Sequence, residues 1–180
     1  VDLIVLGALK RENVVKFYLG SIARKITRQA KCSVLLLIKP SVERHPCQHI
    51  VVNGFDSPQT KDTIGAAFVV AKALGAKKIS LVEEISRSKV AISVDDDRSL
   101  RRATLRKERL RRQEQTRVKD VVRNLPDTLK NNVNWTTQSI FGRRGYSIGH
   151  YAKVVRADLL IMNAQEKLSF IDRLITRDIE

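Results

Sequence analysis

The stretch from His49 to Ile85, HIVVNGFDSPQTKDTIGAAFVVAKALGAKKISLVEEI, decides the fold. It opens with an apolar run rich in β-branched residues, Ile50–Phe55, which Asp56-Ser57-Pro58 follows. A polar cap residue and then a proline at the first helical position are typical of a helix N-terminus, because proline lacks the N–H that this position leaves unused. We therefore expect a helix to begin here, with Asp56 as its cap.

The residues after Pro58 repeat with the period of a helix. Apolar side chains recur at positions 64, 67, 68, 71 and 74, Gly75 follows as a stop signal, and Ile79–Val82 forms a second apolar strand. A strand, a helix and a strand within about 35 residues predict a βαβ unit with parallel strands and a right-handed crossover. The fold class is therefore α/β.

Composition limits the class of protein and the kind of partner. Of the 180 residues, 43% are hydrophobic and 5% aromatic, which fits an α/β protein with an aliphatic core. No apolar run approaches the roughly 20 residues that span a bilayer, and we recognise no signal peptide. The 2 cysteines are too few for a disulfide framework and indicate a cytosolic setting. The net charge of +15 predicts an anionic neighbour: nucleic acid, an acidic protein or an anionic membrane surface.

The first forty residues predict a second strand-helix-strand segment. Val1–Gly7 is apolar enough for a strand buried on both faces. Gly20-Ser21 then opens a helix, which we expect to turn Ile22, Ala23 and Ile26 inward, and Ser33–Ile38 is another buried strand.

This segment resembles the last third of a universal stress protein domain. In the nucleotide-binding branch of that family, the loop reads Gly, two residues, Gly, nine residues, Gly-Ser or Gly-Thr, and the spacing holds here at Gly7, Lys10 and Gly20-Ser21. The resemblance implies that these four residues contact the phosphates of ATP or another adenine nucleotide. Glycine lets backbone approach a phosphate, and a helix N-terminus points free N–H groups at it. Lys10 replaces a glycine and could either add a charge or fill the phosphate's space, and a connection without any ligand is the alternative.

A polar connector, residues 41–49, precedes the second copy of the fold. Its His45, Cys47 and His49 would share one side of an extended segment, which could hold a metal, although a solvated link is the simpler interpretation. Residues 50–85 resemble the opposite end of a universal stress domain, where an Asp closing the first strand contacts the nucleotide. Asp56 takes that position here, with helix capping as its alternative role.

A long basic helix is expected over about residues 98–125, after the acidic cluster Asp95-Asp96-Asp97. Its thin apolar stripe suits a helix that covers a sheet. We interpret its exposed arginines as contacts for anionic lipid headgroups, with a solvated outer face as the alternative. Nucleic acid is disfavoured, because aromatic residues are not interleaved with the basic ones. The residues of the stripe are Leu100, Ala103, Leu110, Val118, Val121, Val122 and Leu125, and the proposed lipid contacts are Arg101, Arg102, Arg106, Arg109 and Arg112.

The end of the chain repeats its beginning. A strand over Val133–Phe141 and a helix over Tyr146–Val155 precede Asp158–Asn163, which matches Asp2–Gly7 at an offset of 156 residues. An offset of one domain length predicts tandem or partial repeats: residues 1–40 end a first domain and residues 50–180 form a second. Residues 1–40 could instead complete the second unit by permutation, or by exchange between two chains. In the second copy Asn163, Glu166, Thr176 and Arg177 replace the phosphate loop, so we expect no ATP there.

Residues 156–180 narrow the resemblance. They are similar to the degenerate second universal stress domain in the cytoplasmic C-terminal region of some bacterial cation:proton antiporters, where a Phe-x-Asp-Arg stretch precedes a final helix and strand. The resemblance implies open parallel sheets with helices on both faces, as in the nucleotide α-hydrolase class. It also implies a regulatory module tethered to the inner face of the cell membrane, with the membrane domain of the same protein as its partner.

Other functions stay open on the sequence. One is a soluble tandem stress protein, a homodimer through its sheet edges, and another is nucleic-acid binding through the basic helix. Catalysis is not expected, because we find no Ser-His-Asp order, metal ligand set or paired carboxylates.

Overall fold

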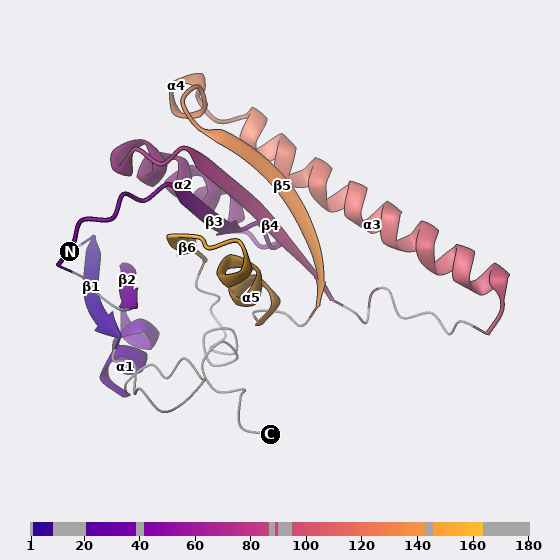
Figure 1. Cartoon of the computed structure of the whole chain (residues 1–180), viewed down its shortest axis with the longest axis horizontal. Helices are drawn as coiled ribbons and strands as arrows, with labels where there is room; N and C mark the ends of the chain where they lie inside the picture. The colour runs from indigo at the N-terminus through magenta and orange to yellow at the C-terminus, as the bar shows by residue number, and fades with distance from the viewer. Residues whose placement is uncertain are drawn as a thin grey trace. The chain divides into compact units, whose positions relative to one another are not determined.

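The computed structural model describes residues 2–8, 21–38, 42–86, 89, 95–142 and 146–163. The chain divides into two compact units, one built on the elements of residues 2–38 and the other on Pro46–Ala164 (Figure 1). Open parallel sheets flanked by helices confirm the α/β class.

The first unit contains β1 (Leu3–Ala8), α1 (Ser21–Gln29) and β2 (Ser33–Ile38). The two strands pair in parallel from Leu3↔Ser33 to Ala8↔Ile38, so the predicted strand-helix-strand segment is confirmed. Its predicted burial is partly wrong. Leu3 and Val5 are about half exposed and Ile22 is exposed, whereas Ala23 is buried. The single helix that the structure describes in this unit leaves part of the apolar surface of the two strands uncovered.

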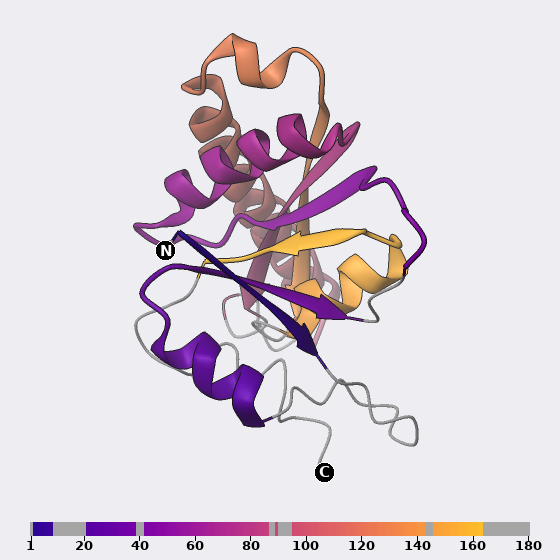
Figure 2. The same ribbon diagram turned by 90° about the vertical axis from the view of Figure 1, so that its left-hand side faces the viewer.

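The second unit is a four-stranded parallel sheet in the order β5-β4-β3-β6. Helices α2 and α3 contact one face, and α5 lies against the other (Figures 1 and 2). The matching segments at the two ends of the chain, in β1 and β6, are both strands, while the tandem organisation stays a prediction. The elements of this unit are β3 (His49–Asn53), α2 (Thr60–Leu74), β4 (Lys78–Ser86), α3 (Asp97–Arg123), α4 (Asp127–Lys130), β5 (Asn134–Gly142), α5 (Tyr146–Val154) and β6 (Leu159–Ile161).

The start of α2 differs from the prediction. The helix begins at Thr60 with Gln59 as its N-cap and no capping side chain, so Asp56 is not the cap and Pro58 is not the first helical residue. The reason is a local turn: the Thr60 hydroxyl donates to the Phe55 carbonyl and accepts from the Ser57 N–H. The predicted stop is confirmed, because Gly75 has a φ of 70°, in the left-handed region that glycine favours.

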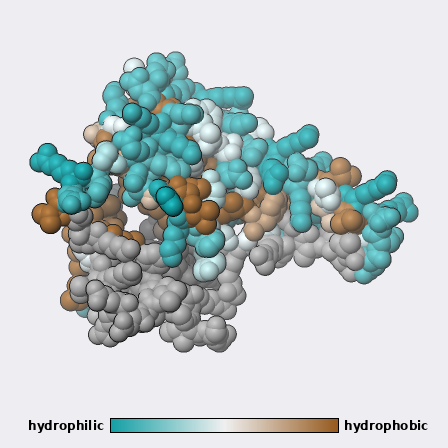
Figure 3. All heavy atoms as spheres, viewed as in Figure 1, coloured by the Kyte–Doolittle hydropathy of each residue, from teal (hydrophilic) through white to brown (hydrophobic). Residues whose placement is uncertain are grey.

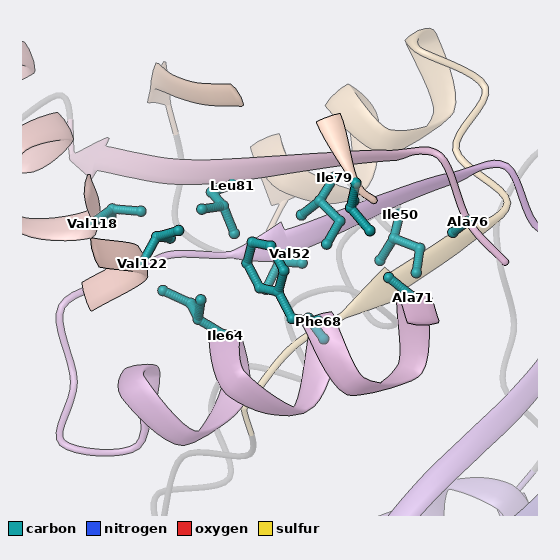
Figure 4. Close-up of a cluster of buried hydrophobic side chains, with 12 residues drawn as sticks. Ile50, Val52, Ile64, Phe68, Ala71, Ala76, Ile79, Leu81, Val118 and Val122 are labelled. Atoms are coloured by element: carbon teal, nitrogen blue, oxygen red, sulfur yellow. The ribbon is translucent and has the colours of Figure 1, made fainter. Parts of the chain in front are cut away.

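The core of the second unit lies between the sheet and helices α2 and α3 (Figure 4). Alternate residues of the strands point into it, namely Ile50 and Val52 of β3 with Ile79 and Leu81 of β4. One face of α2 and the C-terminal half of α3 supply most of the rest, and Ala76 and Val133 complete the cluster. The residues from the two helices are Ile64, Ala67, Phe68 and Ala71, with Val118 and Val122.

Helix α3 begins and ends close to where the sequence predicted. The Asp96 carboxylate accepts from the Ser99 N–H at 2.7 Å, while the Ser99 hydroxyl accepts from the Asp96 N–H, which makes a capping box. The stripe is only partly buried, and Leu100 is 52% exposed. The first half of α3 extends past the strands (Figure 1), so no strand of the sheet lies beneath it. Within the part of the chain that the structure describes, no helix is both long and apolar enough for a bilayer.

Candidate functional site

The strand order of the second unit marks one edge of its sheet as a candidate site. In open parallel sheets, ligands bind beyond the carboxyl ends of the strands, at the point where the strand order reverses. Here β4 and β5 lie on one side of β3 and β6 lies on the other, and helices α2 and α5 cover opposite faces of the sheet (Figure 2). The loop Gly54–Ser57, which follows β3, and Asn163, which follows β6, lie at this edge.

Hydrogen bonds hold this loop to the sheet. The Gly54 N–H donates to the Val82 carbonyl at 2.8 Å, and the buried Asn53 side chain accepts from the Phe55 N–H at 3.0 Å. Asn163 donates from Nδ2 to the Ser57 hydroxyl at 2.5 Å, which ties the end of β6 to the start of α2. The edge therefore presents amide and hydroxyl groups that already bind one another.

Arg117 of α3 fixes the same loop from the side of the helix. Its Nη2 donates to the Gly54 carbonyl at 2.5 Å, and its Nε donates to Glu114 at 3.0 Å. The Asp56 carboxylate lies 3.8 Å from Nε but is 70% exposed, so solvent screens this pair. The sequence singled out Asp56 as a nucleotide contact. The structure places it beside Arg117, and nucleotide contact stays a prediction.

Glu83 of β4 is a buried acid next to this loop, and sequence reasoning missed it. It is 1% exposed, and its Oε2 accepts from the Ser139 hydroxyl of β5 at 2.8 Å. Its Oε1 has no hydrogen-bond partner among the described residues. Burial raises the pKa of Glu83 to about 7, against lowering effects from Ser139 and Arg117. The signal was available, because Glu83 continues the inward alternation of Ile79 and Leu81.

The other buried polar groups of this unit have structural partners. Glu84 points to the opposite face, where it accepts from the Ile148 N–H near the start of α5 at 2.7 Å. His49 Nε2 lies 2.8 Å from the Ser80 hydroxyl, and the Asp158 carboxylate accepts from the His49 N–H at 2.9 Å. Across the described ranges, no three His, Cys, Asp or Glu side chains are grouped to hold a metal ion.

The predicted phosphate contacts lie in the first unit. Gly7 is the fifth residue of β1, and a Cβ built on it would meet no atom within 4 Å. Ser21 is the first residue of α1. Lys10 and Gly20 fall outside the described residues, so the joint role of the four residues stays a prediction.

The predicted lipid contacts project from α3. All five arginines are exposed, and hydrophilic side chains gather along this helix, with apolar residues between them (Figure 3). Three of the five, Arg102, Arg106 and Arg109, line an open groove together with Leu105, Leu110 and Gln113. A cationic surface with apolar residues between the charges suits an anionic partner.

Comparisons with known proteins define the class of the fold. Residues 1–37 match the universal stress protein family. The universal stress protein UspA from Lactobacillus plantarum has a similar structure, with 19% identity, a TM-score of 0.51, and coverage of 70% of this chain and 83% of that one. A functionally unknown protein from Pseudomonas aeruginosa gives 13% identity and a TM-score of 0.51, with coverage of 96% of this chain and 57% of that one.

A putative universal stress protein from Pseudomonas aeruginosa, 14% identical over the same shares of the two chains, also has a TM-score of 0.51. No curated protein matches the chain. The chain thus has an α/β fold similar to that of universal stress proteins, which agrees with the fold class that the sequence predicted.

Proposed function

We propose that this chain is a universal stress-type regulatory module that binds ATP or another adenine nucleotide through the loop after β1. One observation carries the proposal. Residues 1–37 match the universal stress protein family, and this same segment contains the four positions of the phosphate-loop pattern, Gly7, Lys10, Gly20 and Ser21. The strand at one end of this loop and the helix at the other support it.

The chemistry of these residues suits a phosphate. A Cβ added to Gly7 would meet no atom within 4 Å among the described residues, so the space beside this glycine is open to a closely approaching phosphate. Ser21 starts a helix with no acidic residue in its first turn, and the free N–H groups there favour an anion. Lys10 adds a positive charge to the same loop.

Calorimetric titration of the 180-residue chain with ATP and ADP tests this proposal. We expect one nucleotide per chain, and we expect Lys10→Ala to weaken binding by about tenfold, the effect of losing roughly 1.4 kcal/mol. Lys25→Ala, on the exposed surface of α1, is the matched control and should bind like the wild type. Absence of a binding heat for both nucleotides would refute the proposal, as would equal effects of the two variants.

We further propose that the module is the cytoplasmic C-terminal region of a cation:proton antiporter, with its basic helix against anionic headgroups. The similarity of residues 156–180 supports the first part, and the exposed arginines of α3 support the second. Membrane helices encoded upstream would favour the antiporter, and an open reading frame without them would favour a stand-alone stress protein.

A flotation assay with vesicles containing phosphatidylserine tests the lipid contact. Each basic residue near such a surface contributes about 1 kcal/mol, so replacing Arg102, Arg106 and Arg109 by Gln should lower partitioning roughly 100-fold. Lys61, Lys72 and Lys77 are exposed elsewhere on the same unit, and their replacement by Gln is the control. Equal partitioning of the two triple variants would contradict the contact. A DNA mobility shift that persists at physiological salt would instead favour nucleic acid.

A further inference from the structure

An ionisable side chain lies where the core pattern calls for an apolar one. Glu83 follows Ile79 and Leu81 on the face of β4 that α3 covers, and it is as buried as they are. A Cβ added to Gly54 would lie 3.2 Å from Val118 Cγ2 and 3.4 Å from Glu83 Cγ, so the acid is packed between the loop and the helix. A buried carboxylate needs hydrogen bonds and a cation, or it must be neutral.

The surroundings of Glu83 favour the neutral acid. Ser139 donates the one hydrogen bond to Oε2, Oε1 has none among the described residues, and Glu83 forms no ion pair within them. The charged groups that act on it belong to α3: Arg117 and Lys119 favour its ionisation, and Glu114 opposes it. Arg117 is hydrogen-bonded to the Gly54 carbonyl and to Glu114, so its guanidinium already has other partners.

We propose that Glu83 is a proton-binding site, and that loss of its proton draws Arg117 away from the Gly54 carbonyl and so detaches the loop Gly54–Ser57 from helix α3. In the protonated state the carboxyl group is neutral, and Arg117 holds the loop at the carboxyl end of β3. When the O–H bond breaks, the proton passes to solvent and the electron pair stays on the carboxylate. The buried anion then competes with the Gly54 carbonyl for the guanidinium of Arg117.

The physical basis is the asymmetry between the two acceptors. A buried carboxylate carries a full negative charge and attracts the guanidinium more strongly than a carbonyl dipole does, so ionisation reverses the preference of Arg117. The loop also loses the charge of Arg117 beside Asp56, 3.8 Å away. This switch between Glu83 and Arg117 does not depend on nucleotide binding in the first unit. It lies at the carboxyl ends of the strands, where a ligand of the second unit would bind, so it makes that site responsive to pH near neutrality.

NMR titration of the 180-residue chain tests the proposal. The Glu83 side-chain carboxyl ¹³C resonance, assigned by its loss in Glu83→Gln, should titrate with a midpoint near 7. The Arg117 Nε–Hε and Gly54 amide resonances should move with the same midpoint in the wild type and stay constant over that range in Glu83→Gln. A Glu83 midpoint below about 5, or an Arg117 resonance that moves identically in both proteins, would overturn the proposal.

Three single substitutions have defined expected effects on the titration midpoint of Glu83. Ser139→Ala removes the one donor and should raise the Glu83 midpoint, whereas Glu114→Gln removes a like charge and should lower it. Glu108→Gln, an exposed acid of α3 paired with Arg111, is the matched control and should leave the midpoint unchanged. A midpoint that moves with Glu108→Gln as far as with the other two would assign the titration to the general charge of the helix and refute the site.

Discussion

Relative to the wild type, the Glu83→Gln variant should gain stability as the pH rises from acid to alkaline. Glutamine keeps the shape of the acid but cannot ionise. The pKa of Glu83 is about 7 in the folded protein against an ordinary value of 4.5. The folded chain therefore holds this proton more tightly than the unfolded chain. The stability that the proton contributes is fully present below pH 4.5 and is lost as pH rises through 7.

The size of this change in stability follows from the difference between the folded and unfolded pKa values of Glu83. At about 1.4 kcal/mol for each pH unit, the ionisation of Glu83 costs about 3 kcal/mol across this window. The stability of Glu83→Gln relative to wild type should therefore increase by about 3 kcal/mol between pH 4 and pH 8, whatever constant difference the amide introduces. Ionisation of the groups that do not interact with Glu83 cancels in this comparison, since both proteins carry them.

Urea unfolding measures this difference. Trp135, the 1 tryptophan of the chain, lies in β5, so its fluorescence reports on the second unit. Glu108→Gln serves as the exposed control and should track the wild type within about 0.5 kcal/mol at every pH. If the difference between Glu83→Gln and wild type changes by less than about 1 kcal/mol from pH 4 to pH 8, the reasoning about burial is wrong.

Three further predictions concern stability. Gly75→Ala should cost about 1 kcal/mol in urea unfolding, because its φ of 70° suits glycine, and Gly75→Asn should cost less; equal losses would contradict this. Asp96→Ala should cost about 1 kcal/mol and speed amide exchange in the first turn of α3, because it removes the capping box, and unchanged exchange would count against it. Burial and Lys78 lower the pKa of His49 from 6.5, so the stability it contributes is present above that pH and lost below it. His49→Gln should flatten the acid side of the stability curve, and an unaltered slope between pH 6.5 and pH 5 would refute this.

Local patterns in the sequence predicted the elements of the fold. Each apolar run became a strand, and the helical period from Ile64 to Leu74 became α2 with Gly75 at its end. These predictions succeeded because backbone propensity, side-chain alternation and glycine conformation act within a few residues. The predicted start of α2 was wrong. The Thr60 hydroxyl binds the Phe55 carbonyl in a turn, so the helix begins after Asp56 and Pro58.

The candidate site depended more on packing than on pattern. The sequence placed Asp56 at a strand end, but its neighbour Arg117 lies 61 residues along the chain, which no local pattern reveals. The burial of Leu100 was expected from its place in the stripe, yet that part of α3 extends past the strands.

What the sequence alone determined was the class of fold, the positions of most strands and helices, and the strong positive charge of α3. What only the tertiary structure decided was which side chains meet at the edge of the second sheet. Glu83 is an ordinary surface acid by composition. It becomes a buried proton site because the order β5-β4-β3-β6 sets Ser139 beside it, and because Gly54 and Val118 of α3 pack at the same place. Burial is a property of the assembled layers, since a side chain loses water only when other elements cover it.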